Sequence, residues 1–226
     1  MINFIYIIIA AGLGYLWGAI PFGYLYVKKV KGIDLTTVGS GRTGGTNSFR
    51  AAGLKVGLVT VFSDVFKGAM SVILARWIFG SFAAEVWLPW ILVTAGVFSV
   101  IGHNWSIFLD WRGGAGTGPN VGWATAVWWP MFLIGAVVMS GMLRFVGIAS
   151  VASLTMAAII PLTFAGLYLA GVPGYDNTLA YIAGGIAAAL VVTWSLRPNI
   201  KRLLAGDERV VGPRAKKGQK TEKVNS

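Results

Sequence analysis

The sequence predicts an all-α integral membrane protein with about seven transmembrane helical segments, one of them short or bent. Hydrophobic residues make up 56% of the 226 residues, and charged residues only 12%. Soluble domains carry roughly twice that charged share, so the composition indicates a protein that lies in lipid. The apolar residues also fall into long runs that glycine-rich or basic loops separate. The chain length suits one helical bundle without a separate soluble domain.

One apolar run, at residues 121–143, allows two interpretations because Trp128, Trp129 and Pro130 lie near its middle. A single continuous span would place Arg144 and the basic C-terminus outside the membrane. Two shorter segments would return Arg144 to the cytoplasm, and proline-broken helices are tolerated where neighbouring protein covers the freed backbone groups. With the broken interpretation, the expected segments are residues 3–27, 56–79, 86–101, 121–129, 131–143, 148–169 and 179–196.

The distribution of basic residues favours the broken interpretation, because cytoplasmic loops carry an excess of Lys and Arg. The opposite side then keeps Glu85 and Asp176, and Arg76 lies near a helix end where it can snorkel. We therefore expect the N-terminus outside and the C-terminus in the cytoplasm. The basic residues that share the cytoplasmic side are Lys28, Lys29, Lys31, Arg42, Arg50, Lys55, Arg112, Arg144, Arg197, Lys201 and Arg202.

The two ends of the chain differ in character. Residues 1–20 lack a basic start and a convincing cleavage site, which indicates a retained helix rather than a signal peptide. Residues 1–206 are expected to form one membrane domain. Residues 207–226 lose the apolar content and are expected to form a disordered basic tail in the cytoplasm, against anionic headgroups.

Two glycine-rich stretches, residues 38–50 and 111–118, are expected to lie together on the cytoplasmic face. Glycines let successive backbone N–H groups form a concave nest that binds an anion. The alternative is a solvated turn, since glycine, serine and asparagine are also the ordinary residues of turns. The first stretch adds neutral donors and forked cations that suit phosphate, namely Ser40, Thr43, Thr46, Asn47, Arg42 and Arg50.

A few ionisable residues lie within or beside the apolar segments. Asp64 and Lys67 are three positions apart, so they share one helix face. They could form a structural ion pair, or Lys67 could face an anionic substrate. His103 could donate to phosphate or orient a loop, or it could cap the end of the third segment.

Several functions are excluded or disfavoured by what the sequence lacks. There is no cysteine, which excludes disulfides and thiolate chemistry, and His103 is the one histidine, so no metal site or cofactor is expected. The acyltransferase motif H-x-x-x-x-D is absent, because Phe108 stands five positions after His103 and Asp110 comes too late. The net charge of +11 is expected to serve lipid contact, with no nucleic acid and no obligate protein partner.

Seven motifs, in order along almost the whole chain before the tail, resemble those of the bacterial acyl-phosphate:glycerol-3-phosphate acyltransferases, the PlsY family. Such an ordered set is much more specific than one glycine loop. The motifs are residues 18–25, 40–50, Asp64-x-x-Lys67-Gly68, 102–104, 111–116, 144–146 and 199–204.

The resemblance implies an enzyme in the bacterial inner membrane with its site facing the cytoplasm. It would transfer an acyl chain from acyl phosphate to the 1-hydroxyl of glycerol 3-phosphate, giving lysophosphatidic acid and phosphate. Carried over by position, Ser40, Asn47 and Arg50 would carry catalysis. Acyl phosphate would be held by Ser40, Gly41, Thr46, Asn47, Gly113 and Gly114, and glycerol 3-phosphate by Arg50, Arg112 and Asn199, with possible support from Asp64, Lys67, His103 and Arg144.

The chain departs from the family pattern at four positions. Ala115 stands where the second loop usually has lysine, and Gly147 where a serine is usual. In the first loop, Arg42 and Gly45 replace the common asparagine and alanine. Arg42 or Arg112 could replace the lost charge. These changes leave open a working variant, altered substrate use or a weakly active paralogue, and a transporter or channel for a phosphorylated or lipidic anion remains the alternative from another class.

Overall fold

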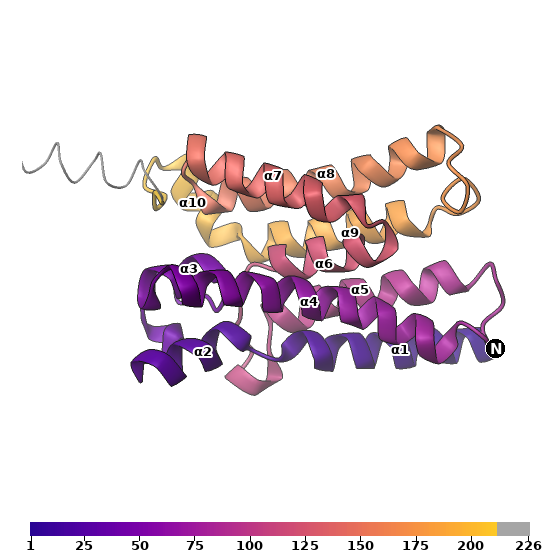
Figure 1. The fold of residues 1–226 in the computed structure, drawn as a ribbon, viewed down its shortest axis with the longest axis horizontal. Helices are drawn as coiled ribbons and strands as arrows, with labels where there is room; N and C mark the ends of the chain where they lie inside the picture. The colour runs from indigo at the N-terminus through magenta and orange to yellow at the C-terminus, as the bar shows by residue number, and fades with distance from the viewer. Residues whose placement is uncertain (212–226) are drawn as a thin grey trace, which may run out of the picture.

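Helices stacked along one axis build the protein, and the computed structural model describes residues 1–211 (Figure 1). Within these residues there is no β-strand, which agrees with the predicted all-α class. The helices α1, α4 and α5 form one layer, α7, α8 and α9 form a second, and α6 lies between them (Figure 1). Their bounds are Ile2–Ala19 (α1), Phe22–Lys31 (α2), Gly45–Ala52 (α3), Leu54–Phe79 (α4), Leu88–Asn104 (α5), Thr117–Val127 (α6), Pro130–Phe145 (α7), Ala149–Leu169 (α8), Ala180–Ser195 (α9) and Arg197–Leu204 (α10).

Two prolines divide apolar runs into separate helices. The broken interpretation of residues 121–143 is confirmed, since α6 ends at Val127 and α7 begins at Pro130. The expectation of one helix over residues 3–27 is wrong, because α1 ends at Ala19 and α2 begins at Phe22. Proline has no backbone N–H to continue a helix, and the apolar character across Pro21 concealed the break.

Three helical units are long and apolar enough to cross a membrane: Ile2–Lys31, Leu54–Phe79 and Ala149–Leu169. A fourth arises if α9 and α10, which meet at a bend of 63°, are taken as one span. The apolar helices Leu88–Asn104 and Pro130–Phe145 are shorter. Each expected segment is therefore helical, and these lengths support an integral membrane protein.

Small residues let α1 and α5 lie against each other. A Cβ atom added at Gly14 would lie 2.2 Å from the carbonyl oxygen of Ala95, and one added at Gly18 would lie 2.2 Å from that of Ser99. Close backbone contact of this kind is how helices associate in lipid, where burying apolar side chains gains little. The pair α1 and α5 is thus closely packed within the first layer.

One end of the bundle gathers the loops that matter for function. The segments before and after α3, the helix α10 and the turn from α7 to α8 lie at the left in Figure 1, whereas the N-terminus lies at the opposite end. The second half of the first glycine-rich stretch is not a loop, since Gly45–Ala52 forms α3. The expected segment ending at residue 101 continues as α5 to Asn104, so His103 lies in a helical turn.

The start of the expected tail is ordered. The N–H of Val211 donates to the carbonyl of Gly147 at 2.7 Å, and Val210 pairs with Ile148 in an antiparallel bridge. Disorder from residue 207 onward is thus wrong for residues 207–211. The remainder of the predicted tail, 212–226, lies outside the described residues.

We predict that Gly18→Ala destabilises the protein by about 1 to 3 kcal/mol, because the new methyl group would overpack against α5. The measurement is thermal unfolding of the purified protein in detergent. Gly12→Ala is the matched control, since nothing lies within 4 Å of a Cβ at that position of α1. It should be neutral or stabilising by up to about 1 kcal/mol, as alanine favours helix. Equal melting temperatures for the two variants would contradict the packing argument.

Candidate active site

The first loop, residues 38–44, is organised by the side-chain amide of Asn47 at the start of α3. Its Nδ2 donates to the carbonyl oxygens of Arg42 (2.9 Å), Val38 (3.0 Å) and Leu35 (3.3 Å). Its Oδ1 accepts from the N–H of Ser40 at 3.0 Å. Asn47 is buried, and all of these bonds go to backbone groups of residues 35–42. The residue therefore sets the loop conformation, which places Ser40 and Arg42.

The second loop, residues 111–116, is held against the first. The N–H of Thr43 donates to the carbonyl of Gly113 at 3.2 Å, and the N–H of Gly114 donates to the carbonyl of His103 at 2.9 Å. A side chain at Gly113 would collide with the backbone of His103. The two glycine-rich stretches thus lie together, as expected, on the end of α5.

A buried charged cluster lies beneath these loops. The Asp64 carboxylate oxygen Oδ1 lies 3.1 Å from Nζ of Lys67 and 3.4 Å from Nδ1 of His103. Lys67 Nζ also donates to the carbonyl of Ile20 at 2.8 Å, at the break between α1 and α2. The shared helix face of Asp64 and Lys67 is confirmed. His103 pairs with Asp64 and does not cap its helix, so the cluster joins α1, α4 and α5.

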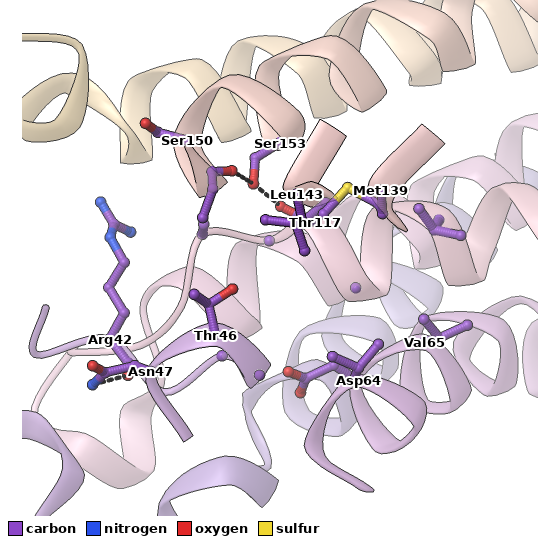
Figure 2. A pocket seen from close by; sticks show the side chains of 18 of the residues that line it. Arg42, Thr46, Asn47, Asp64, Val65, Thr117, Met139, Leu143, Ser150 and Ser153 are labelled. Atoms are coloured by element: carbon purple, nitrogen blue, oxygen red, sulfur yellow. Dashed lines mark hydrogen bonds between the residues drawn. The ribbon is translucent and has the colours of Figure 1, made fainter. Parts of the chain in front are cut away.

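A cavity of about 420 Å³ opens between the first layer and the second (Figure 2). In Figure 2, Thr46 and Asp64 line it from one side, and Ser150, Ser153 and Met139 from the other. Its polar end carries loop and serine groups, including the hydroxyl of Ser150, which is buried without a hydrogen-bond partner among the described residues. Its other walls are apolar, from α4 and α7, and include Leu58, Val61, Phe62, Val65, Phe132, Ala136, Met139 and Leu143.

A second cavity, of about 340 Å³, adjoins the first and has a different character. It is framed by tryptophans and by the arginines of the second loop and α10. Ser40, Arg42 and Asn199 line both cavities, so they form the partition between them.

Arg42 holds this partition together. Its Nη1 donates to the carbonyl of Gly114 (2.9 Å) and to Oγ of Ser195 (3.0 Å). Its Nη2 donates to the carbonyl of Ser195 (2.6 Å) and to Oδ1 of Asn199 (3.0 Å). Burial lowers the pKa of the Arg42 guanidinium, and nearby Arg202 lowers it further, but an arginine of this kind stays charged at neutral pH. Arg42 thus connects both loops to α9 and α10.

The predicted site residues divide between the two cavities. Of the residues expected to hold acyl phosphate, Thr46 and Asn47 line the first cavity, Ser40 lines both, and the glycines Gly41, Gly113 and Gly114 line the second. Of those expected to hold glycerol 3-phosphate, Arg50 lines the first, Arg112 the second and Asn199 both.

The supporting residues are also divided. Asp64 and His103 line the first cavity, and Lys67 reaches them from behind. Arg144 lies exposed at the end of α7, over the ring of Phe145, and lines neither cavity. The structure therefore does not bring Arg144 to the other candidates.

Some cavity residues had no signal in the sequence. The carboxylate of Glu208 lies on a buried side chain, accepts from Nδ2 of Asn199 at 3.1 Å and lies 3.3 Å from Nε of Arg202. It belongs to a stretch that looks like a basic tail, and only the fold returns it to the site. Ser150 and Ser153 lie on an apolar helix, where serines are unremarkable in sequence.

Comparison with known proteins decides the family. The model of the family described as glycerol-3-phosphate acyltransferase matches residues 8–206. The chain belongs to this family. The glycerol-3-phosphate acyltransferase of Synechococcus sp. (strain CC9902) is 37% identical over 204 residues, covering 90% of this chain and 94% of that protein. That of Gloeobacter violaceus is 36% identical over 198 residues, covering 88% of this chain and 91% of that protein.

Solved structures agree with this assignment. Crystal structures of PlsY (YgiH), an integral membrane glycerol 3-phosphate acyltransferase, were obtained in a lysophosphatidic acid form and a glycerol 3-phosphate form. The first matches with a TM-score of 0.74 at 31% identity and covers 91% of this chain and 95% of its own. The second matches with a TM-score of 0.72 at 32% identity, covering 94% and 96%. The predicted resemblance is confirmed, and this glycerol-3-phosphate acyltransferase is an integral membrane enzyme.

One departure of this acyltransferase from the family pattern has a structural reason. Gly147 has a φ of +74°, in the left-handed region that disfavours a serine side chain. Its carbonyl receives the N–H of Val211. Glycine at this position thus fits the tight turn between α7 and α8 on which the C-terminal segment rests.

We predict that Lys67→Met costs about 3 to 5 kcal/mol of stability, because it leaves the Asp64 carboxylate buried without its cation. The double variant Asp64→Asn/Lys67→Met should be more stable than Lys67→Met, since it removes the unpaired charge. Thermal unfolding in detergent measures both. The ion-pair account is wrong if the double variant is the less stable one.

We predict that Asn47→Asp reduces acyltransferase activity by about a hundredfold or more, since a carboxylate would face three carbonyl oxygens in place of an amide donor. Turnover of the purified enzyme is the measurement. Asn3→Asp, a change of the same chemistry at the opposite end of the bundle, serves as control. Equal activity of the two variants would show that the loop does not depend on the Asn47 amide.

Proposed function

We propose that the enzyme transfers an acyl chain from acyl phosphate to the 1-hydroxyl of glycerol 3-phosphate, forming lysophosphatidic acid and inorganic phosphate. One observation carries this proposal: a single cavity joins an apolar wall to a polar end made by two glycine-rich loops. Such a cavity matches a substrate that has a long hydrocarbon chain and an anionic head. The related PlsY structures in lysophosphatidic acid and glycerol 3-phosphate forms point to the same product and acceptor.

The placement of the substrates follows from the walls of the cavity. The acyl chain would lie between α4 and α7, along apolar side chains such as Val61 and Met139. Ser40 and Thr46 would bind near the anhydride and its phosphate, helped by the N–H groups of the loop. Arg50 and Asn199 would hold glycerol 3-phosphate, since a guanidinium pairs with phosphate in a forked geometry.

The chemistry requires little from the protein beyond positioning. An acyl phosphate is an activated mixed anhydride, so the acceptor hydroxyl can attack its carbonyl carbon directly. The new ester C–O bond forms, the bond from the acyl carbon to the phosphate oxygen breaks, and a substrate phosphate oxygen takes the hydroxyl proton. Two oriented anions and N–H donors aimed at the developing oxyanion could supply most of the rate enhancement.

The same proposal includes the orientation in the membrane. Seven crossings would put the N-terminus outside and both glycine-rich loops in the cytoplasm of a bacterial inner membrane. The gathering of the segments around α3, of α10 and of the turn from α7 to α8 at one end supports this (Figure 1). The helices α2 and α10 at that end carry basic residues such as Lys28 and Lys201.

We predict that the purified enzyme releases phosphate from palmitoyl phosphate only when glycerol 3-phosphate is present. Arg50→Ala should raise the KM for glycerol 3-phosphate by about tenfold or more, because one charge-assisted contact to phosphate is lost. A colorimetric phosphate assay over a range of both substrates measures these effects.

The control is Lys55→Ala, which removes an exposed cation at the start of α4 outside both cavities. Its KM should stay within about twofold of the wild type, since exposed charges contribute little. Folded protein that releases no phosphate above the no-enzyme rate would defeat the proposed function.

A further inference from the structure

The guanidinium of Arg42 is a partly buried positive charge with neutral partners. All four of its hydrogen bonds go to carbonyl, hydroxyl or amide oxygens. Within residues 1–211, no carboxylate lies within ion-pair distance of it. Removing a charge from water is costly, even in part, unless an opposite charge compensates for it. The arrangement therefore suits an anionic ligand at this point.

The nearest acid is already engaged. Glu208 acts on Arg42 only from a distance, since its carboxylate accepts from Asn199 and pairs with Arg202.

The Nε–H group of Arg42 has no hydrogen bond among the described residues, because all four bonds of the guanidinium use the two Nη groups. The side chain can thus contact a ligand without giving up its hold on the loops.

Position distinguishes Arg42 from the other arginines near the site. Among the arginines of the described part, it alone lines both cavities, together with Ser40 and Asn199. Its Nη1 donates to the carbonyl of Gly114, the residue that precedes Ala115. The positive charge of Arg42 therefore lies beside the position in the second loop where the family usually has lysine and this chain has alanine.

Arg112 does not provide this charge. Its Nη1 donates to Oγ1 of Thr36 at 3.2 Å, and its Nη2 lies 3.6 Å from a carboxylate oxygen of Asp110. More than half of its side chain is exposed. Of the two arginines that could replace a loop lysine, Arg42 is the one that is partly buried and donates to the second loop.

We propose that Arg42 binds the phosphate group of the acyl-phosphate donor at the junction of the two cavities and supplies from the first loop the charge that Ala115 does not. This rests on the proposed function and deepens it. The phosphate of the acyl-phosphate donor is favoured over that of glycerol 3-phosphate for a reason of position. Arg42 lines the second cavity together with Gly41, Gly113 and Gly114, whereas Arg50 lines only the first cavity. The released inorganic phosphate would leave through the basic second cavity.

The test moves the charge from one loop to the other. Arg42→Asn should raise the KM for palmitoyl phosphate roughly tenfold to a hundredfold, as expected for losing charged hydrogen bonds, with the KM for glycerol 3-phosphate within about threefold of wild type. The double variant Arg42→Asn/Ala115→Lys should recover about tenfold of that loss, since it returns a cation to the same place. Arg42→Lys should lie between, because lysine keeps the charge but not the fork.

The matched control is Lys201→Asn. Lys201 is an exposed cation of α10 that lines neither cavity. Both KM values should stay within about twofold of wild type for an exposed charge. If Lys201→Asn impairs the enzyme as much as Arg42→Asn, general positive charge rather than Arg42 is responsible, and the proposal is overturned.

A binding measurement separates this proposal from the proposed function. Calorimetry with inorganic phosphate, without any turnover, should show binding to the wild type that weakens about tenfold or more in Arg42→Asn and returns in the double variant. If the wild type releases no phosphate, the proposed function fails, while calorimetry still decides the role of Arg42. Unchanged phosphate binding in Arg42→Asn overturns the proposal, as does a KM effect confined to glycerol 3-phosphate. If Arg42→Asn does not yield folded protein, Arg42→Lys and the double variant carry the test.

Discussion

The bundle depends on one buried ammonium group that links the break between two helices to an ion pair. Where Pro21 interrupts the first apolar run, the carbonyl of Ile20 accepts from the N–H of Phe22 at 3.1 Å and from Nζ of Lys67 at 2.8 Å. A charged group inside a membrane segment is costly unless it is paired. Lys67 is paired twice, because its second contact is the carboxylate of Asp64. The break between α1 and α2, the ion pair and the position of His103 therefore depend on one another, because Lys67 and Asp64 contact all of these parts.

Short-range sequence patterns predicted the parts of the fold that depend on neighbouring residues. The break at Pro130 follows from the missing N–H of proline, and the pairing of Asp64 with Lys67 follows from helical spacing. The break at Pro21 was missed because the residues on both sides are equally apolar. The helix α3 was missed because glycines at its start indicate a loop.

The sequence predicted which residues line the cavities better than it predicted how these residues are arranged. Composition and motif order marked Ser40, Thr46 and Arg50, and the structure brings them to one cavity. It could not be foreseen that Arg42 would bond to Ser195 and Asn199, more than 150 residues later in the chain. Contacts between such distant residues depend on how α9 and α10 pack against the first loop, and no pattern among neighbouring residues predicts that packing.

The apolar end of the first cavity has a further consequence for how the enzyme meets its donor. Leu58 and Phe62 line this cavity, and their exposed fractions are 49% and 62%. Both lie on α4, a helix long and apolar enough to cross a membrane. A hydrophobic donor that entered between such side chains from the bilayer would be sensed as a mole fraction within a two-dimensional solvent rather than as a concentration in water. Added lipid or detergent would slow it by surface dilution alone, with every contact in the site unchanged.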